Sequence, residues 1–338
     1  MVSASWDVEV FEKDLRLAER FTISGASWDV ARNVFVVLSH NGLAGVGEAS
    51  PDARSGETPA SVAAELQGLD LSGLSGPFDL EGASCMLAPG AAGSALDIAM
   101  HDLAAKAAGV TVADLLGCGG RRLPLTSVTV PIAEVGDMAR RARSLSDHPI
   151  LKLKVGFEGD VDAVRAVRAV FPGVIRIDAN EGWDVLTAKA RLAELEPCDI
   201  ELCEQPVAAP DLDGLAEVAA STSIPVFADE AARTSHDVAL LAGVVDGVNL
   251  KLRKAGGIRR TVAAIAVARA HGLRVMLGCD LTSGVAATAE AHVSALVDYA
   301  DLDGPLLLAD DPWPGVSYSK GAMTLPPGPG LGLQRTPL

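Results

Sequence analysis

From Pro124 onward, short apolar runs return along the chain at a spacing of roughly 22–27 residues, and helical patterns rich in Ala, Arg and Glu separate them. Two of these helical patterns cover 160–170 and 258–270. A strand followed by a helix at this spacing is typical of a βα unit, and about eight such units close into a barrel. The predicted strands are 125–130, 150–155, 174–177, 200–203, 224–228, 247–250, 273–277 and 296–301.

The first third of the chain has a different pattern. Trp6, Val8 and Val10 alternate with polar residues, which predicts antiparallel strands within 1–50, and helical patterns follow over 59–69 and 92–108. The predicted fold class is therefore α/β: a modified (β/α)8, TIM-like barrel with an α+β N-terminal capping domain. We expect a capping domain over 1–120, a catalytic barrel over 121–310, and a Pro- and Gly-rich segment over 311–338 that packs back on the cap.

Composition and charge exclude several classes of partner. The chain has 338 residues and a formal net charge of −16, which disfavours nucleic acid and anionic lipid as partners. No stretch approaches 18 uncharged apolar residues, and the start lacks a basic segment followed by an apolar run, so we expect neither a membrane span nor a signal peptide. Five cysteines without a CxxC pair are typical of reduced thiols, which predicts a cytoplasmic protein.

Two lysines stand on one face of the second predicted barrel strand. Leu151, Leu153 and Val155 alternate with Lys152 and Lys154, so both lysines point to the opposite face from the apolar residues. Alternating lysines usually mark a solvated strand face. In a closed barrel, however, that face points inward, and a buried ammonium group requires a partner of opposite charge. The pattern therefore favours a functional site inside the barrel.

Acidic residues follow the next three strands at the same end. Asp178, Glu204 and Asp229 end strands three, four and five, and catalytic groups of such barrels lie at the carboxyl ends of the strands. A single aspartate there is often a helix or turn cap. Three carboxylates that converge repel one another unless a cation lies among them, and an all-oxygen ligand set favours Mg²⁺ over Mn²⁺ or Ca²⁺.

A third lysine completes the pattern from the opposite side of the predicted barrel. Lys251 ends strand six, so Lys154 and Lys251 would flank the ion from opposite sides. The ion would bind a substrate carboxylate and stabilise the enediolate that forms when the α-proton leaves. One lysine would remove that proton and the other would return a proton to the opposite face, with Lys152 beside them.

These residues lie in five motifs that resemble the enolase superfamily. The motifs are LKLKVG at 151–156, RIDANEGW at 176–183, ELCEQPV at 201–207, FADEA at 227–231 and VNLKLRKAGG at 248–257. The lysines on strands two and six are similar to those of the muconate lactonizing enzyme subgroup. Within it, Asp301-Leu302-Asp303 resembles the DxD signature of dipeptide epimerases such as L-Ala-D/L-Glu epimerase.

The resemblance implies a set of roles. Lys154 and Lys251 would be the acid/base pair, supported by Lys152, and Asp178, Glu204 and Asp229 would bind Mg²⁺. Asp301 and Asp303 would hold the α-ammonium group of a dipeptide, a role that two carboxylates at a rim also suit by charge. The expected activity is 1,1-proton transfer at the α-carbon of the dipeptide's C-terminal residue, catalysed by an isomerase that acts on amino acid derivatives.

The first-domain loop differs from that of relatives that prefer glutamate as the second residue of the dipeptide substrate. Those relatives resemble each other in having an arginine in a first-domain loop, and none stands at Gly25-Ala26-Ser27. We therefore expect Arg253 or Asp280 to contact the substrate instead. Arg253 could serve an acidic side chain or form a surface ion pair. Asp280 could pair with a cationic side chain or cap the following helix.

The sequence is also compatible with other functions. An N-acylamino acid racemase, an o-succinylbenzoate synthase or a cycloisomerase would use the same site without an α-ammonium group, so Asp301 and Asp303 would have no role. A non-catalytic binding barrel would have no need for two opposed lysines. Side-chain preference and pathway are not encoded in any motif. A homo-oligomer is possible because such barrels often assemble, although the sequence shows no interface signal.

Overall fold

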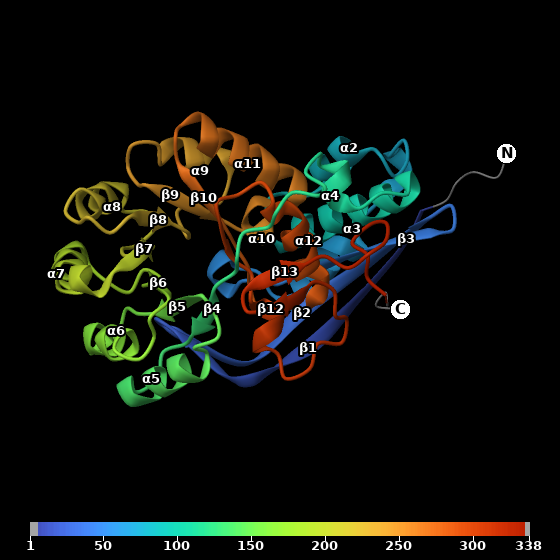
Figure 1. Cartoon of the computed structure of the whole chain (residues 1–338). Helices are drawn as coiled ribbons and strands as arrows, with labels where there is room; N and C mark the ends of the chain where they lie inside the picture. Colours follow the sequence, from blue (N-terminus) through green and yellow to red (C-terminus); the bar gives the residue numbers. More distant parts are fainter. Residues whose placement is uncertain (1–5, 335–338) are drawn as a thin grey trace.

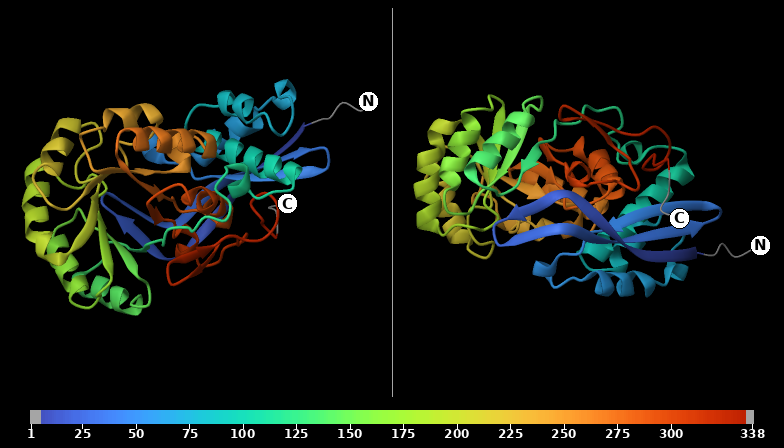
Figure 2. Two further views of the ribbon diagram at one scale, coloured as in Figure 1. Left: turned by 45° about the horizontal axis from the view of Figure 1, so that its top comes forward. Right: turned by 90° about the horizontal axis from the view of Figure 1, so that it is seen from below.

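The computed structural model describes residues 6–334, and both outer ends of the predicted domains, 1–5 and 335–338, lie outside the described part. The chain begins with a three-stranded antiparallel sheet of β1 (Trp6–Ile23), β2 (Ala26–His40) and β3 (Leu43–Ala49). Its β1–β2 hairpin is long and extends beyond the cap across the open end of the barrel (Figures 1 and 2). At the hairpin, the amide of Ile132 donates to the carbonyl of Thr22 at 2.9 Å.

Four helices complete the capping domain, and the longest packs directly on the sheet. These helices are α1 (Pro59–Gln67), α2 (Leu80–Met86), α3 (Ala91–Ala108) and α4 (Val112–Leu115), with 3₁₀ turns η1 (Ala53–Ser55) and η2 (Leu71–Gly73). A Cβ atom at Gly47 would lie only 1.9 Å from the carbonyl oxygen of Ala95. The two elements can approach this closely only because the strand carries glycine at the contact.

Eight parallel strands form the predicted barrel, in the order in which they follow along the chain. They are β4 (Val128–Val130), β5 (Ile150–Lys154), β6 (Val174–Asp178), β7 (Ile200–Glu204), β8 (Val226–Ala228), β9 (Gly247–Leu250), β10 (Arg274–Gly278) and β11 (Tyr299–Asp301). A parallel bridge between Thr126 and Ala300 joins the first unit to the last. All eight predicted strands are present, which confirms the fold class.

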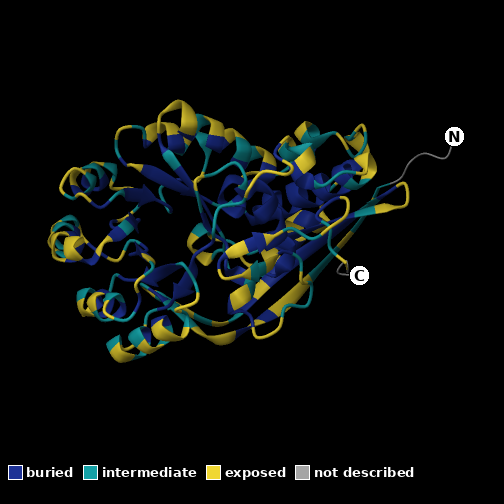
Figure 3. Cartoon of the chain, viewed as in Figure 1, coloured by how far each residue is buried: buried dark blue, intermediate teal, exposed yellow. Residues whose placement is uncertain are grey.

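Helices surround the strands on the outside. They are α5 (Val135–Ser144), α6 (Asp160–Arg168), α7 (Val185–Leu195), α8 (Leu212–Ala219), α9 (Ser235–Leu240), α10 (Leu252–Ala255), α11 (Ile258–Ala270) and α12 (Gly284–Ser294), with 3₁₀ turns η3 (Glu196–Cys198) and η4 (Gly304–Leu307). Figure 3 shows buried strands and exposed outer helix faces. No helix in the described part of the chain is both long and apolar enough to cross a membrane.

The first barrel strand is shorter than its apolar run predicts. The sequence predicts a strand over 125–130, whereas β4 begins at Val128. The amide of Thr126 donates instead to the carbonyl of Gly321, at 2.9 Å, in the turn of the C-terminal hairpin β12 (Ser317–Ser319) and β13 (Ala322–Thr324). A tertiary partner therefore takes the hydrogen bond that a longer strand would have used.

The C-terminal segment and the cap contact each other, and the cap also contacts the barrel. The amide of Leu331 donates to Asp102 Oδ1 on α3 at 2.8 Å. Glu48 of β3 accepts from the amides of Ser283 and Ala286 at 2.9 and 3.0 Å, so a capping-domain carboxylate satisfies the first turn of α12. Asn33 also donates to the carbonyl of Leu281 at 2.9 Å, which fixes the loop after β10 over the barrel.

Candidate active site

Lys152 and Lys154 both point into the barrel from β5. They are 2% and 8% exposed, and the leucines that alternate with them are fully buried on the helix side of the strand. A charged side chain at this depth is stable only beside opposite charge. The β5–β6 register places Lys154 directly opposite Asp178, and their Nζ and Oδ2 atoms lie 2.6 Å apart.

The three predicted metal-binding carboxylates lie at one level of the barrel. Asp178 pairs in register with Glu204 on the next strand, and Asp229 directly follows β8. Lys251 follows β9, four strands away from β5, and its Nζ lies 3.0 Å from Asp229 Oδ2. The structure therefore brings these predicted residues together, with Lys154 and Lys251 on opposite sides.

Lys152 lies among carboxylates from three strands. Its Nζ is 2.6 Å from Asp301 Oδ2, 2.8 Å from Glu204 Oε2 and 3.0 Å from Asp178 Oδ2. Burial alone would lower the pKa of Lys152, but these carboxylates together hold it well above the usual lysine value. Lys152 is therefore a fixed positive charge at the centre of the site.

The donor set fits a hard divalent cation. Glu204 Oε2 is buried and its one cationic neighbour among the ion pairs of the described residues is Lys152 Nζ, at 2.8 Å. Burial together with nearby Asp178 still raises the pKa of Glu204 to about 8, and a bound cation would offset that effect. Within residues 6–334 no three acidic, histidine or cysteine side chains are arranged to hold a metal ion as they stand, and the ammonium group of Lys152 lies within 3.0 Å of Asp178 and 2.8 Å of Glu204.

Two residues that sequence reasoning left without a role hold Asp229 in place. Lys254 is buried and donates to both the carboxylate and the carbonyl of Asp229, and to the carbonyl of Asn249 at 3.0 Å. Gln205 Oε1 accepts from the amide of Asp229 at 2.9 Å. Lys254 lies in the motif at 248–257, three residues after Lys251, and this position is the sequence feature that could have identified it as a site residue.

Asp301 and Asp303 lie beside this cluster and line the same cavity. Asp301 accepts from Ser127 Oγ at 2.6 Å, and Asp303 accepts from the amide of Thr129 at 2.6 Å. Burial and neighbouring Asp301 raise the pKa of Asp303 to about 6, and Asp303 forms no ion pair within the described residues 6–334. An ammonium group of a ligand would supply one.

Arg253 and Asp280, both predicted to contact the substrate, bind each other. Arg253 Nε and Nη2 donate to the two carboxylate oxygens of Asp280 at 2.8 and 3.2 Å. The alternative in which Asp280 caps a helix is wrong, because Ser283 is the N-cap of α12. Arg253 does form an ion pair, the alternative to contacting an acidic substrate side chain, but the pair is buried and not at the surface.

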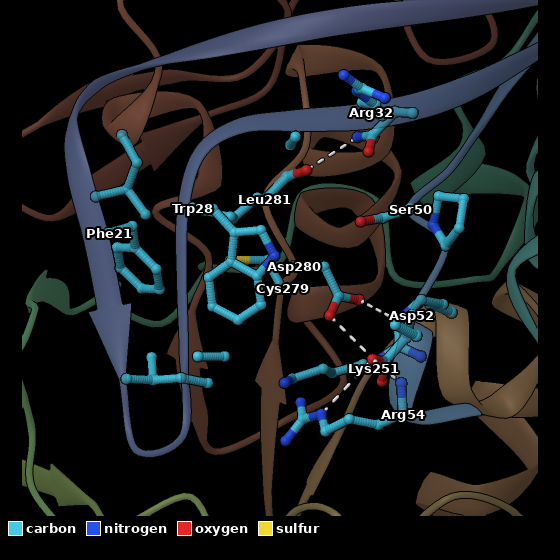
Figure 4. A pocket seen from close by; sticks show the side chains of 18 of the residues that line it. Phe21, Trp28, Arg32, Ser50, Asp52, Arg54, Lys251, Cys279, Asp280 and Leu281 are labelled. Atoms are coloured by element: carbon cyan, nitrogen blue, oxygen red, sulfur yellow. Dashed lines mark hydrogen bonds and ion pairs between the residues drawn. The ribbon is translucent and has the colours of Figure 1, made fainter. Parts of the chain in front are cut away.

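A cavity of about 670 Å³ joins these groups under the hairpin (Figure 4). Figure 4 shows Phe21 and Trp28 of the hairpin on one side of it, and Asp52, Arg54 and Lys251 on the other. The nearest arginine before Gly25 is Arg20, which is exposed and whose Nε lies 3.4 Å from Ser27 Oγ. This wall of the cavity is therefore mainly apolar.

The barrel, the capping domain and the inward-facing charged groups define an enolase-like protein. The mandelate racemase / muconate lactonizing enzyme N-terminal domain matches residues 5–117, and the enolase C-terminal domain-like family matches residues 134–337. The chain belongs to this family. An L-Ala-D/L-Glu epimerase of Bacteroides thetaiotaomicron is 35% identical over 96% of this chain and 87% of its own length. A hydrophobic dipeptide epimerase of Roseobacter litoralis is 38% identical over 92% and 94%.

Solved structures agree with this assignment. A dipeptide epimerase from Cytophaga hutchinsonii, complexed with Mg and D-Ala-L-Val, has a TM-score of 0.91 and 32% identity, covering 99% of this chain and 96% of its own. An N-succinyl Arg/Lys racemase from Bacillus cereus has a TM-score of 0.92 at 28% identity, covering 98% and 95%. The same architecture is therefore found in a dipeptide epimerase and in a racemase of N-succinyl amino acids.

Proposed function

We propose that this protein is a Mg²⁺-dependent dipeptide epimerase, an isomerase that transfers a proton at the α-carbon of the C-terminal residue of a dipeptide. One observation carries the proposal: opposed lysines and an unpaired Asp303 line one cavity. Lys154 and Lys251 approach from β5 and β9, while Asp303 stands at the end of β11. The named epimerases among the relatives support the same reaction.

Each group of residues has its own role in the proposed reaction. Asp301 and Asp303 bind the α-ammonium group of the dipeptide and thereby fix its orientation. Asp178, Glu204 and Asp229 would hold Mg²⁺, and the ion would bind the substrate carboxylate and stabilise the negative charge that develops there. Lys152 adds a fixed positive charge beside it. One of Lys154 and Lys251 accepts the α-proton, and the other donates a proton to the opposite face.

Each lysine must lose a proton before it can act as the base. Burial acts to lower the pKa of Lys251, but Asp229 and Asp280 raise it above the usual lysine value. Asp178, Glu204 and Asp229 would hold Mg²⁺, whose positive charge would offset the effect of Asp229 on the pKa of Lys251.

Racemisation of N-acylamino acids is the main alternative within the family. Such substrates carry no free α-ammonium group, so Asp303 would keep an uncompensated buried carboxylate. The raised pKa of Asp303, caused by burial and by Asp301, therefore favours an ammonium-bearing dipeptide. The cycloisomerase and o-succinylbenzoate synthase reactions fail the same criterion.

The test is direct conversion of L,L-dipeptides. Purified protein with Mg²⁺ would be incubated with pooled L,L-dipeptides and, separately, with N-succinyl and N-acetyl amino acids, and the products separated by chiral chromatography. Formation of L,D-dipeptides, abolished by EDTA and restored by Mg²⁺, is expected. Conversion of the N-acyl amino acids alone would overturn the proposal in favour of the racemase.

We also propose a cytoplasmic location, a division into segments 1–120, 121–310 and 311–338, and no nucleic acid partner. The acidic charge and unpaired cysteines support the first and last points. Contacts such as the bridge between Thr111 and Gly330 support the packing of the final segment on the cap. A homo-oligomer stays a prediction for size-exclusion chromatography with light scattering.

A further inference from the structure

A layer of inward-facing residues in the barrel holds one asparagine beside the proposed metal site. Leu202 of β7 and Met276 of β10 belong to one buried apolar cluster. Successive residues of a strand point to opposite faces, so Glu204 and Gly278, two positions further along these strands, face inward at the next level. Asn249 of β9 pairs in register with Met276 and also faces inward.

Asn249 reaches Glu204 across the intervening strand β8. The side chain of Asn249 is fully buried, and its Nδ2 donates to Glu204 Oε1 at 2.8 Å. The other carboxylate oxygen, Oε2, lies 2.8 Å from Lys152 Nζ. Glu204 is therefore fixed by one neutral donor and one ammonium group. Asn249 does not line the cavity, so any effect on the reaction would pass through Glu204 and not through a contact with substrate.

A carboxamide suits this position because it donates a hydrogen bond without adding charge. An ammonium group there would offset the negative charge that a metal ion requires, and a further carboxylate would add to the repulsion within the site. Asn249 Oδ1 is buried and accepts no hydrogen bond in the described part of the chain. A buried amide that served stability alone would be expected to pair both of its polar groups, so the contact with Glu204 is the feature that accounts for this residue.

The main chain of Asn249 links this contact to a second carboxylate that is proposed to bind the metal ion. Its carbonyl accepts from Lys254 Nζ at 3.0 Å, and the same ammonium group donates to the carboxylate of Asp229. Asn249 is thus connected to Glu204 by its side chain and to Asp229 through its backbone. We propose that Asn249 is a positioning residue that orients Glu204 for the metal ion; this rests on the proposed function.

Gly278 on the neighbouring strand β10 leaves the space that Asn249 occupies. A Cβ atom at Gly278 would lie 2.6 Å from Asn249 Oδ1 and 2.7 Å from its Nδ2, which is too close for either atom to stay in place. The φ angle of Gly278 is not positive, so an alanine would not strain the backbone there. Asn249 is short and lies on a buried strand, so its carboxamide would have to move away from Glu204. Gly278→Ala should therefore act on Glu204 through Asn249.

Isothermal titration of the purified protein with Mg²⁺ tests this role. Asn249→Ala should weaken Mg²⁺ binding by about 10–100-fold, the usual effect of losing a group that orients a metal ligand. Gly278→Ala should also weaken it. The double variant should bind Mg²⁺ no more weakly than Asn249→Ala alone, because the added methyl group then meets no carboxamide. Epimerisation of an accepted L,L-dipeptide by Asn249→Ala should recover at saturating Mg²⁺, which general damage to the fold would not allow.

Ser294→Ala is the control, because it also removes a buried hydrogen bond, from Ser294 Oγ to the carbonyl of Ala291 at 2.8 Å on α12; it should keep the original Mg²⁺ affinity. Equal affinity in Asn249→Ala and the unaltered protein would overturn the inference and leave the epimerase standing. Additive losses in the double variant would overturn the role of Gly278. No Mg²⁺ binding by the unaltered protein would overturn the proposed metal site and this inference together. If Asn249→Ala does not fold, Gly278→Ala keeps every polar group, and unchanged affinity in that variant would overturn the inference.

Discussion

Lys152 Nζ lies 2.6 Å from Asp301 Oδ2, and this contact joins the two groups of carboxylates in the site. On one side Lys152 contacts Asp178 and Glu204, which are proposed to bind the metal ion. On the other side Asp301 stands beside Asp303, proposed to bind the substrate ammonium group. Loss of one ammonium group would therefore disturb both ends of the substrate site.

Lys152→Met should destabilise the fold and make it depend on Mg²⁺. The substitution leaves three buried carboxylates without their shared cation, which costs on the order of 3–5 kcal/mol. Urea unfolding with and without Mg²⁺ would measure this, and Mg²⁺ should stabilise the variant more than the unaltered protein. Lys189→Met removes a partly exposed surface pair and should change the free energy of unfolding by at most about 0.5 kcal/mol. Equal stability of both variants would contradict the prediction.

Asp303→Asn should impair substrates that carry an α-ammonium group. Loss of the carboxylate removes a charge-assisted contact, so kcat/KM for a dipeptide should fall about ten- to a hundredfold. Steady-state rates on an L,L-dipeptide and its N-acetyl derivative would measure the effect. The ratio between the two substrates should fall in the variant, whereas exposed Asp310→Asn should preserve it. An unchanged ratio in Asp303→Asn would show that the ammonium group binds elsewhere.

Lys254→Met should weaken the metal site without touching the substrate. Lys254 fixes Asp229 through its carboxylate and carbonyl, and loss of such a support typically costs about 10–100-fold in metal affinity. Isothermal titration with Mg²⁺ would give the dissociation constant directly. Lys320→Met, on the exposed turn between β12 and β13, serves as the matched control. Equal Mg²⁺ affinity in both variants would refute the positioning role of Lys254.

His292 should make stability depend on pH in the mildly acidic range. Burial lowers the pKa of His292 to about 4, and its Nδ1 accepts from the amide of Ala113 at 3.2 Å, a bond that protonation would break. The unfolded chain binds the proton at an ordinary histidine pKa, so the contribution is complete above about pH 6.5 and is lost as pH falls toward 4.

The loss should amount to about 3 kcal/mol at the acidic limit. Urea unfolding at several pH values would compare the unaltered protein with His292→Gln, whose stability should fall less steeply between pH 6.5 and 4. His271→Gln changes an exposed histidine and should keep the original slope. Parallel slopes for the unaltered protein and His292→Gln would contradict the assignment.

The barrel strands could be predicted because each is marked by residues that are neighbours in the sequence. Each buried strand is a short apolar run, and strict alternation on β5 revealed that Lys152 and Lys154 share the inward face. The positions of Asp178, Glu204 and Asp229 followed from the rule that parallel strands end at one edge of the sheet. The shorter β4 could not be predicted, because the hydrogen bond that ends it comes from Gly321, almost two hundred residues later.

The supporting residues of the site were harder to predict. Lys254 and Gln205 both contact Asp229 on another strand, and Glu48 contacts Ser283 in the barrel, so each partner lies outside the residue's own strand or helix. The pairing of Arg253 with Asp280 could not be predicted, because it depends on how close the ends of β9 and β10 lie in the folded protein.

Solvent exchange in single-lysine variants tests the central claim most directly. In D₂O with Mg²⁺, Lys154→Ala and Lys251→Ala would each be offered the L,L and the L,D epimer of one accepted dipeptide, with deuterium at the α-carbon read by mass spectrometry. Each variant should exchange the α-proton of one epimer only, and the two variants should prefer opposite epimers. Exchange of the same epimer by both variants, or full epimerisation by either, would contradict the account of two opposed bases.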